Sequence, residues 1–356
     1  RSAMKSGTTV IIIRASISDK RGNLSFENEG AYLGAMELAL AAHNNGGIVI
    51  AQVRRIVENE TIPMHHVRVP GILIDYIVEA PDQWQTTQTP YDPAISGELR
   101  KPLTDFAFME FGVGKVIARR VARELKRGWA VNLGFGVSAN VPRILLEEGE
   151  HGACTWVIEQ GAVGGIPLLD FQFGCSSNAE AIVASPHQFT YFQAGGFDCA
   201  LLSFLQIDQQ GSVNVHKLGA RPHVTAGAGG FVDITARARK IVYSGFFNAG
   251  AKMEIKDGKL VIEKEGKIKK LVKACEQVTF SGRRGVTQGQ DVTYITERGV
   301  MELTPDGIVV TEIAPGVSLQ ENIIEQSEFP LIISPRLKIM DAKYFRDEKM
   351  GSALHG

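Results

Sequence analysis

Residues 130–139, AVNLGFGVSA, decide the fold. Strand-forming residues lead into Gly134 and Gly136, and an apolar pattern typical of a helix follows. A second strand is predicted at residues 154–158, so the segment predicts a β-α-β unit of the kind that builds a parallel sheet. The same alternation occurs earlier, with a strand at 10–14, a helix at 31–43 and a strand at 48–53. We therefore predict an α/β fold with open, mostly parallel sheets.

The composition is that of an ordinary globular protein of 356 residues, with 38 basic and 39 acidic side chains. This balance provides no field for gathering nucleic acid or an anionic membrane surface. The longest apolar runs have the length of strands, far short of a membrane span. Four scattered cysteines without a C-x-x-C pair argue against zinc and disulfides. We expect a cytoplasmic protein, or one of the mitochondrial matrix in a eukaryote, without a metal site.

A proline-rich stretch separates two regions with a regular α/β pattern. Residues 79–104 contain four prolines and are predicted to be a linker between two domains. An amphipathic helix is expected at residues 115–127. Lys256-Asp257-Gly258-Lys259 predicts a tight turn in a β-hairpin over residues 253–264. Residues 341–356 are expected to form a tail.

Two segments of the chain resemble each other. Residues 16–25, SISDKRGNLS, and residues 205–214, LQIDQQGSVN, each combine a strand with an Asp-x-x-Gly turn and an aliphatic residue. In each case a predicted helix and then a predicted strand follow. This order favours a duplication over two unrelated turns. The second copy has a full β-α-β region ahead of its turn, so we expect the first copy to lack most of its own glycine-rich region at the N-terminal side.

The first motif that could bind a ligand is the loop Gly134-Phe135-Gly136-Val137. Its glycines allow close approach of the backbone, and the helix that follows offers unpaired N–H groups to an anion. The next strand ends in an acid, Glu159, about 25 residues after Gly134. This spacing also fits a dinucleotide-binding fingerprint, in which the acid binds the ribose. A tight turn that binds no phosphate is an equally good interpretation of the loop alone.

The second motif is EQGAVGG, residues 159–165. Glu159 lies at the carboxyl end of a predicted strand, where α/β sheets place their ligands. We expect the three glycines behind it to leave open space and a mobile backbone. The alternative for an unselected Glu beside Gly is a solvated turn residue.

The third motif is AGAGGF, residues 226–231. Small residues ahead of a helix can form a backbone nest whose N–H groups point at a developing oxyanion. Such a nest and a flexible loop are equally good interpretations of this motif.

These motifs together resemble the family I coenzyme A transferases, especially the single-chain acetate/propionate CoA-transferases of the YdiF type. Further segments with matching order and spacing are residues 44–53, 70–76, 211–214, 280–282, 294–298 and 312–316. The resemblance implies that Glu159 forms a glutamyl-CoA thioester and that Gly229 and Gly230 lie beside it as oxyanion support.

By the same resemblance, Gly134, Gly136, Val137 and Gly227 are expected to bind CoA. Coenzyme A is then a substrate, held covalently in the intermediate, and no metal or redox cofactor is needed. The other substrate is a short-chain carboxylate, and a homodimer or homotetramer is expected.

The resemblance also implies two related open α/β half-domains. Residues 1–78 would be the remainder of the first half, 79–104 the linker and 105–340 the second half with Glu159. One departure lies at residues 244–251, SGFFNAGA, where relatives usually have Thr-x-Thr-Ala-Gly-Gly. Two other functions stay open: an NAD-dependent oxidoreductase with Gly134 and Glu159 as its dinucleotide site, and a non-catalytic acyl-CoA-binding protein.

Overall fold

The computed structural model describes residues 9–219 and 227–354, which form two compact units. The first unit contains the chain up to Pro102 together with Ile158–Gln188, and the second contains Leu103–Val157 and the chain from Phe189 onward. The chain therefore leaves the first unit, begins the second, and returns once before completing the second. These two units are defined by contacts between residues, whereas the predicted half-domains were defined by the internal repeat, so the two divisions differ.

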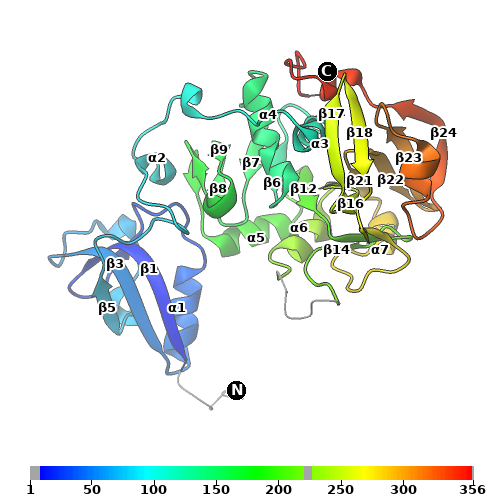
Figure 1. The fold of residues 1–356 in the computed structure, drawn as a ribbon. Helices are drawn as coiled ribbons and strands as arrows, with labels where there is room; N and C mark the ends of the chain where they lie inside the picture. The colour runs from blue at the N-terminus through cyan, green and yellow to red at the C-terminus, as the bar shows by residue number, and fades with distance from the viewer. Residues whose placement is uncertain (1–8, 220–226, 355–356) are drawn as a thin grey trace. The chain divides into compact units, whose positions relative to one another are not determined.

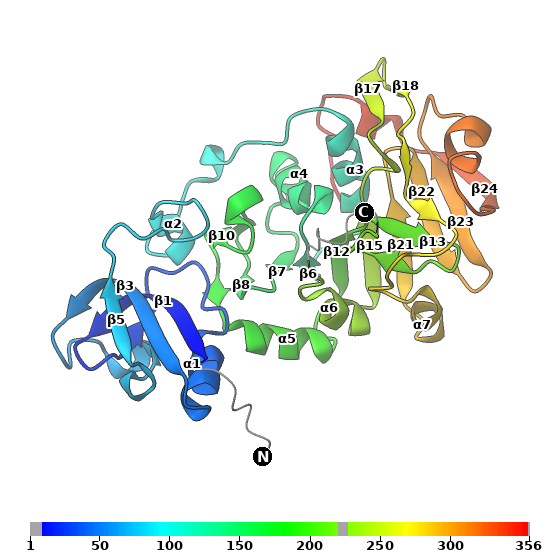
Figure 2. The same ribbon diagram turned by 60° about the horizontal axis from the view of Figure 1, so that its bottom comes forward.

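The first unit is built on a five-stranded sheet with the order β4-β2-β1-β3-β5. Strand β1 is parallel to β3, and β3 to β5, while β2 is antiparallel to β1 and β4. Helix α1 packs against β1 and β3 and buries Ala39 and Ala42 (Figures 1 and 2). The bounds are β1 Val10–Asp19, β2 Leu24–Ser25, α1 Ala35–Asn44, β3 Ile48–Val57, β4 Val67–Val69 and β5 Tyr76–Glu79.

The predicted linker is an ordered part of the first unit. It contains the short helix α2 (Pro93–Ser96), which begins at Asp92, whose side chain accepts a hydrogen bond from the Ala94 N–H, and ends at Gly97 with φ +81°. Ile95 of this helix is fully buried and packs with Cys175. The prolines of this segment therefore mark turns and a helix start within a packed unit.

Two short antiparallel strand pairs complete the returning segment of the first unit. Strand β8 (Ala162–Val163) pairs with β11 (Ala181–Ile182), and β9 (Ile166–Pro167) pairs with β10 (Ser176–Ser177). Helix α5 (Ser185–Gln193) begins where the Ser185 N–H donates to the Leu33 carbonyl. These contacts attach the returning segment to the loop before α1.

The second unit is built on a larger sheet in which β7, β6, β12, β15 and β21 are parallel. Strands β22 and β23 continue it in antiparallel fashion, and β24 pairs parallel to β23 (Figures 1 and 2). The bounds are β6 Ala130–Leu133, β7 Thr155–Val157, β12 Cys199–Ser203, β15 Lys240–Ser244, β21 Asp291–Ile295, β22 Gly299–Thr304, β23 Gly307–Ile313 and β24 Ile332–Ile339.

Helices cover the parallel part of this sheet. Helix α3 packs against β15 and β21, α4 packs against α3, and α6 packs against β12. Their bounds are α3 Val113–Ala122, α4 Val141–Glu147, α6 Phe231–Arg237 and α7 Gly282–Thr287. The predicted α/β architecture with mostly parallel sheets is confirmed. No helix among residues 9–219 and 227–354 is long and apolar enough to span a membrane.

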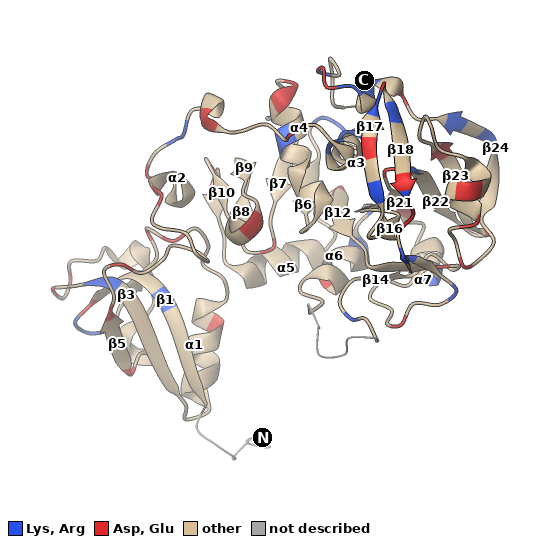
Figure 3. Ribbon diagram, viewed as in Figure 1, with Lys and Arg blue, Asp and Glu red and all other residues tan. Residues whose placement is uncertain are grey.

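The second unit also contains a three-stranded sheet and two-stranded sheets. The predicted hairpin is confirmed as β17 (Lys252–Lys256) and β18 (Lys259–Lys264), joined by Asp257 and Gly258, which both have positive φ. Figure 3 shows charges of both signs along this hairpin, as expected for a solvated ribbon. The other elements are the sheet β14-β13-β20 (β13 Gln206–Asp208, β14 Val213–Asn214, β20 Leu271–Val272) and the pair β16 (Asn248–Ala249) and β19 (Ile268–Lys269).

The C-terminal segment is packed against the second unit as far as Leu354, so the predicted tail is not an extended one. Tyr344 and Phe345 are buried in the core of the second unit. Fully buried Arg119 of α3 donates to the Glu348 carbonyl at 3.0 Å, and the Glu148 carboxylate accepts the Met350 N–H at 2.8 Å. Charged groups of α3 and of the residue after α4 thus hold this segment in place.

Candidate functional site

Glu159 lies at the tip of a tight turn directly after β7. The Ile158 N–H donates to the Ala162 carbonyl at 2.9 Å, and the Gly161 N–H donates to the Ile158 carbonyl at 2.9 Å. Glu159 and Gln160 therefore project from a closed four-residue turn, and the Glu159 side chain is half-buried. The prediction that this acid follows a strand end is confirmed.

The glycines behind Glu159 are close-packed, and the expectation of open space and mobile backbone was wrong. A Cβ on Gly161 would lie 1.9 Å from the Val183 carbonyl oxygen, and one on Gly165 would lie 2.4 Å from the Ser177 carbonyl oxygen. Gly161, Gly164 and Gly165 also have φ values of +117°, +72° and +71°. Glycine is required here because backbone segments meet with no room for a side chain. The turn is consequently rigid.

A buried side chain fixes the same turn from a second side. The Gln188 amide, 4% exposed, donates to the Ile158 carbonyl at 3.1 Å. The Val183 N–H also donates to the Gly161 carbonyl at 2.9 Å. Both Val183 and Gln188 belong to the segment around the start of α5. Glu159 is thus presented on a turn whose two ends are hydrogen-bonded to one neighbouring segment.

The glycine loop after β6 lies against β12 within the second unit. The Gly134 N–H donates to the Leu201 carbonyl at 2.7 Å, and a Cβ on Gly134 would lie 2.9 Å from that oxygen. Gly136 has φ +119° and precedes a 3₁₀ turn that starts at Val137. Packing against β12 alone accounts for both glycines. A role of Gly134, Gly136 and Val137 in binding CoA stays a prediction.

The second glycine loop precedes α6. Gly227 and Gly229 are exposed with φ values of +77° and +52°, whereas Gly230 is buried and directly precedes the helix. The Phe231 N–H donates to the Ala228 carbonyl at 3.1 Å, which folds the loop back on itself. Ala226, the first residue of the predicted motif, lies outside the described residues. The exposed glycine backbone can be approached by a ligand, so oxyanion support by Gly229 and Gly230 stays a prediction.

The two glycine loops belong to the second compact unit, whereas Glu159 belongs to the first. Within the second unit, both loops lie next to β12: one contacts its residues directly, and the other leads into α6, which packs on that strand. The structure thus brings Gly134 and Gly136 beside the strand that α6 covers.

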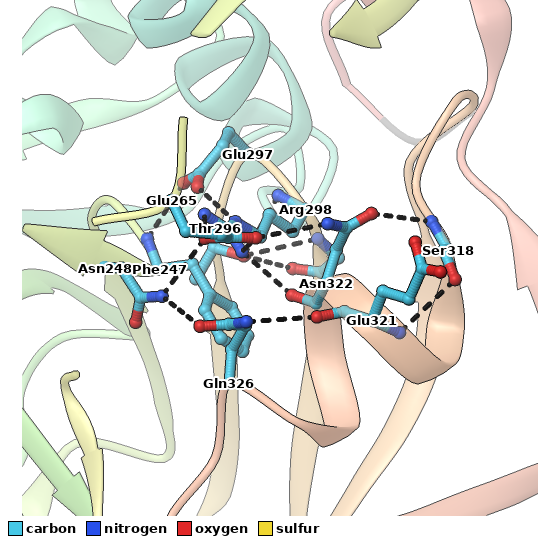
Figure 4. Close-up of polar contacts among 11 residues, drawn as sticks. Phe247, Asn248, Glu265, Thr296, Glu297, Arg298, Ser318, Glu321, Asn322 and Gln326 are labelled. Atoms are coloured by element: carbon cyan, nitrogen blue, oxygen red, sulfur yellow. Dashed lines mark hydrogen bonds and ion pairs between the residues drawn. The ribbon is translucent and has the colours of Figure 1, made fainter. Parts of the chain in front are cut away.

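A buried ionic network, which the sequence analysis missed, holds residues 244–251. Glu297 and Arg298 follow β21 and are both fully buried. The Glu297 carboxylate accepts the Phe247 N–H at 2.9 Å and the Arg298 Nε–H at 3.1 Å (Figure 4). Arg298 also makes a bidentate pair with Glu265, at 2.9 and 2.7 Å. The segment that departs from the usual family pattern is therefore anchored by charged groups.

The two carboxylates of this network respond differently to their surroundings. Burial raises the pKa of Glu297, and its hydrogen bonds with Arg298 and Phe247 offset this only in part. Burial also acts to raise the pKa of Glu265, but hydrogen bonds from Arg298 and Asn322 outweigh it and leave this pKa below its usual value. An adjacent acid and base directly after an apolar strand was the available sequence signal for this network.

No group of three or more His, Cys, Asp or Glu side chains that could hold a metal ion occurs among residues 9–219 and 227–354. Cys154, Cys175, Cys199 and Cys275 are free thiols.

The sequence and fold match known coenzyme A transferases. A family model described as Coenzyme A transferase matches residues 3–80. Caffeate CoA-transferase of Acetobacterium woodii is 43% identical over 345 residues, an alignment that covers 95% of this chain and 66% of that protein. The chain belongs to the coenzyme A transferase family. Acetate CoA-transferase YdiF of Escherichia coli (strain K12) is 40% identical over 347 residues, covering 97% of the chain and 65% of that enzyme.

A solved structure supports the same assignment. The acyl-CoA transferase YdiF of E. coli O157:H7, crystallised as a thioester complex with CoA, superposes with a TM-score of 0.88 at 39% identity. The match covers 97% of the chain and 64% of that structure. The chain thus spans 64% to 66% of the length of these relatives. The decarboxylase AibA/AibB, at 19% identity and a TM-score of 0.52, shares the fold alone.

Proposed function

We propose that the protein transfers coenzyme A between an acyl-CoA and a free carboxylate through a glutamyl-CoA thioester on Glu159. The observation that carries this proposal is the rigid turn that presents the Glu159 carboxylate directly after a strand of the sheet. Supporting it are the identities of 43% and 40% to two CoA-transferases and the fold shared with a relative solved as a CoA thioester. Acetate-like short-chain acids are the proposed acceptors.

A carboxylate is suited to this chemistry without a separate base. A glutamate side chain in water is ionised at neutral pH, so it can attack a thioester carbonyl directly. The attack forms a C–O bond and a tetrahedral oxyanion, and its collapse breaks the C–S bond. Coenzyme A leaves as the thiolate, and Glu159 is left as a mixed anhydride with the acyl group.

The second half of the cycle returns the thiolate to the enzyme. The thiolate attacks the glutamyl carbonyl, breaks the anhydride C–O bond and releases the first acid as its carboxylate. The product is the glutamyl-CoA thioester, and an incoming carboxylate reverses these steps. Each tetrahedral species needs N–H donors, and the loss of one typically costs about 3 to 4 kcal/mol. We assign this support to the exposed loop around Gly229 and Gly230, and CoA contacts to Gly134, Gly136, Val137 and Gly227.

The local topology disfavours a dinucleotide site at the same residues. In a dinucleotide-binding fold, the strand that carries the ribose-binding acid leads into a crossover helix. Here the chain reverses directly after Glu159, because the Ile158 N–H is bonded to the Ala162 carbonyl. The segment after Glu159 continues into the short strands β8 and β9 and not into a crossover helix.

The decisive experiment looks for the covalent intermediate. The full-length protein is incubated with acetyl-CoA without an acceptor acid, and the peptide that contains Glu159 is examined by mass spectrometry. We expect a CoA adduct that hydroxylamine removes and that Glu159→Ala abolishes. Glu159→Asp should lower the rate of adduct formation by about a hundredfold or more, because it withdraws the nucleophile by roughly 1 Å.

A neighbouring exposed acid serves as the matched control. The Glu180 side chain lies against Gly164 in the same unit, so Glu180→Ala removes a nearby carboxylate without touching the turn itself. We expect the adduct to form at the wild-type rate in this variant. A wild-type protein that binds acetyl-CoA without any adduct would show that it is a binding protein and not a transferase.

A further inference from the structure

A pocket of about 380 Å³ lies within the first compact unit. Its walls come from the loop before α1, the start of that helix, β4 and residues 182–187. All of these belong to the unit that also contains Glu159. The pocket shares walls with a second hollow of about 320 Å³ around Tyr32 and Leu33.

The pocket and the Glu159 turn share one wall. Val183 lines the pocket, and its backbone N–H and carbonyl both meet Gly161, two residues after Glu159. The Val183 N–H donates to the Gly161 carbonyl at 2.9 Å, so the pocket wall and the turn are hydrogen-bonded to each other. A ligand in the pocket is therefore held against the segment that supports the proposed nucleophile.

The lining suits a flat apolar group. Phe26 and Tyr32 meet edge to face with ring centroids 5.9 Å apart, and the Arg68 guanidinium lies 4.7 Å from the Tyr32 ring centroid. Planar groups of this kind pack against an aromatic ring by edge-to-face or stacked contacts. Apolar side chains such as Met36 and Ile182 add to the wall.

The charged side chains around the pocket do not favour a ligand that carries a second carboxylate besides the one joined to CoA. Among the described residues that line it, Arg68 is the one lysine or arginine, and Glu37 contributes a negative charge at the start of α1. Glu37 is the only acidic or basic residue of that helix apart from His43 (Figure 3). The lining thus contributes one charge of each sign, so the body of the ligand is expected to be uncharged.

The volume also discriminates between candidate acids. Pockets of about 300 to 1,000 Å³ hold ligands of drug size, so a volume of about 380 Å³ far exceeds what a two-carbon acid needs. We propose that this pocket holds the uncharged aromatic body of the carboxylic acid whose CoA ester the protein uses. This inference rests on the proposed transferase function and names an aryl-substituted acid as the acyl group of the donor CoA ester, while acetate-like acids stay the proposed acceptors.

The test narrows the pocket and compares two thioesters. Ala184 lines this pocket and not the neighbouring hollow, so Ala184→Phe fills it selectively. The rate of adduct formation on Glu159 is measured with 3-phenylpropionyl-CoA and with acetyl-CoA. We expect the ratio of the two second-order rate constants for adduct formation, 3-phenylpropionyl-CoA over acetyl-CoA, to fall by roughly tenfold or more, because pocket shape discriminates between acyl groups by about 10- to 200-fold.

Ala181→Phe is the matched control, since Ala181 is exposed on the neighbouring strand β11 and does not line the pocket. Its ratio should stay at the wild-type value. An unchanged ratio in Ala184→Phe would overturn the proposal, as would an equal loss with both thioesters, which would place the CoA arm in the pocket.

A separate binding measurement keeps this test independent of catalysis. Binding of 3-phenylpropionate to the full-length protein is measured by calorimetry, and Ala184→Phe is expected to weaken it by about tenfold or more while Ala181→Phe is not. If neither thioester forms an adduct, the transferase proposal fails. The calorimetry then decides separately whether the pocket binds the aromatic acid. Equal binding of 3-phenylpropionate to both variants would then overturn the pocket assignment.

Discussion

The outer two of three paired strand positions are exposed in one copy of the duplicated motif, whereas the equivalent positions are buried in the other. In the first unit, Ile12 of β1, Ile50 of β3 and Tyr76 of β5 lie side by side in register. In the second unit, Leu201 of β12, Val242 of β15 and Thr293 of β21 do the same. Ile12 and Tyr76 are 69% and 60% exposed, whereas Leu201 and Val242 are fully buried.

The match between the two copies extends to individual hydrogen bonds. The Asp19 carboxylate accepts the N–H groups of residues 21 and 23, and the Asp208 carboxylate accepts those of residues 210 and 212. In each turn the N–H of the following glycine, Gly22 or Gly211, donates to the aspartate carbonyl. The repeat predicted from the sequence is confirmed, and a shared Asp-x-x-Gly turn is its physical basis.

A distant glycine contacts each turn in the same way. The Gly71 N–H donates to the Asn23 side chain, and the Gly282 N–H donates to the Ser212 side chain. A Cβ on Gly71 would lie 2.1 Å from the Arg21 carbonyl oxygen. One on Gly282 would lie 1.9 Å from the equivalent oxygen in the second copy. Both copies thus need a glycine where a later segment crosses the turn.

What differs is the covering of the sheet. In the second unit α3 packs against β15 and β21, while in the first unit α1 covers one face and leaves Ile12 and Tyr76 exposed on the other. The run of four apolar residues at the start of β1 has the composition of a strand covered on both faces. Similar local sequences therefore give the same strand register in two different environments.

The largest expected effect comes from truncating the two equivalent strand positions. Leu201→Ala removes a fully buried side chain and should lower the free energy of unfolding by about 2 to 5 kcal/mol. Ile12→Ala removes a side chain that is 69% exposed and should change it by less than about 0.5 kcal/mol. Urea unfolding of the two variants measures both values. Equal losses would show that the Ile12 face is covered in solution.

The crossing glycines should give the next largest effect. Gly282→Ala and Gly71→Ala each force a methyl group onto a carbonyl oxygen, which costs about 1 to 3 kcal/mol or more. We expect similar losses of the free energy of unfolding, because the crossing is the same in both copies. Gly152→Ala and Gly34→Ala are the controls in the second and first units, since a Cβ there meets nothing closer than 3.7 Å. A tolerated Gly71→Ala would break the equivalence of the two copies.

Much of the fold could be predicted because it depends on short-range patterns. Strands of alternating or continuous apolar residues, the Asp257-Gly258 turn and the Asp-x-x-Gly repeat are local signals. Residues 67–78 have a strand-like sequence, but they form β4, a 3₁₀ turn at Gly71–Leu73 and β5. The interruption arises because Gly71 crosses the distant turn at Arg21, which no local pattern reveals.

The residues of the candidate site could be predicted from the sequence, but the tertiary contacts that hold them could not. The position of Glu159 after a strand follows from local sequence, and so does the presence of glycines behind it. That these glycines are close-packed depends on Val183 and Ser177, which come from the returning segment. The Glu297–Arg298 network depends on Glu265, which lies more than thirty residues away in sequence. Tertiary partners decide such features, and sequence spacing does not fix them.

The smallest predicted effect concerns how α3 is attached to the second copy. Strand β15 of the second copy begins with Lys240, at the position where β3 of the first copy begins with Ile48. The Lys240 ammonium group forms an ion pair with the Glu124 carboxylate, which follows α3, at 2.7 Å. Burial acts to raise the pKa of Glu124, but Arg120 and Lys240 outweigh it, so this pKa is lower in the folded protein than its usual value of 4.5. The stabilisation is therefore present above about pH 4.5 and is lost as the pH falls through the folded pKa.

Glu124→Gln removes this charge and should lower the free energy of unfolding by about 1 kcal/mol at neutral pH. The difference from the wild type should shrink as the pH falls from about 6 to about 3, because the wild-type carboxyl group becomes protonated there while the amide of the variant does not titrate. Urea unfolding across this pH range measures it. Glu58→Gln, at an exposed ion pair of the first unit, should change stability by less than about 0.5 kcal/mol. A difference for Glu124→Gln that stays constant with pH would mean that its ion pairs do not attach α3 to the sheet.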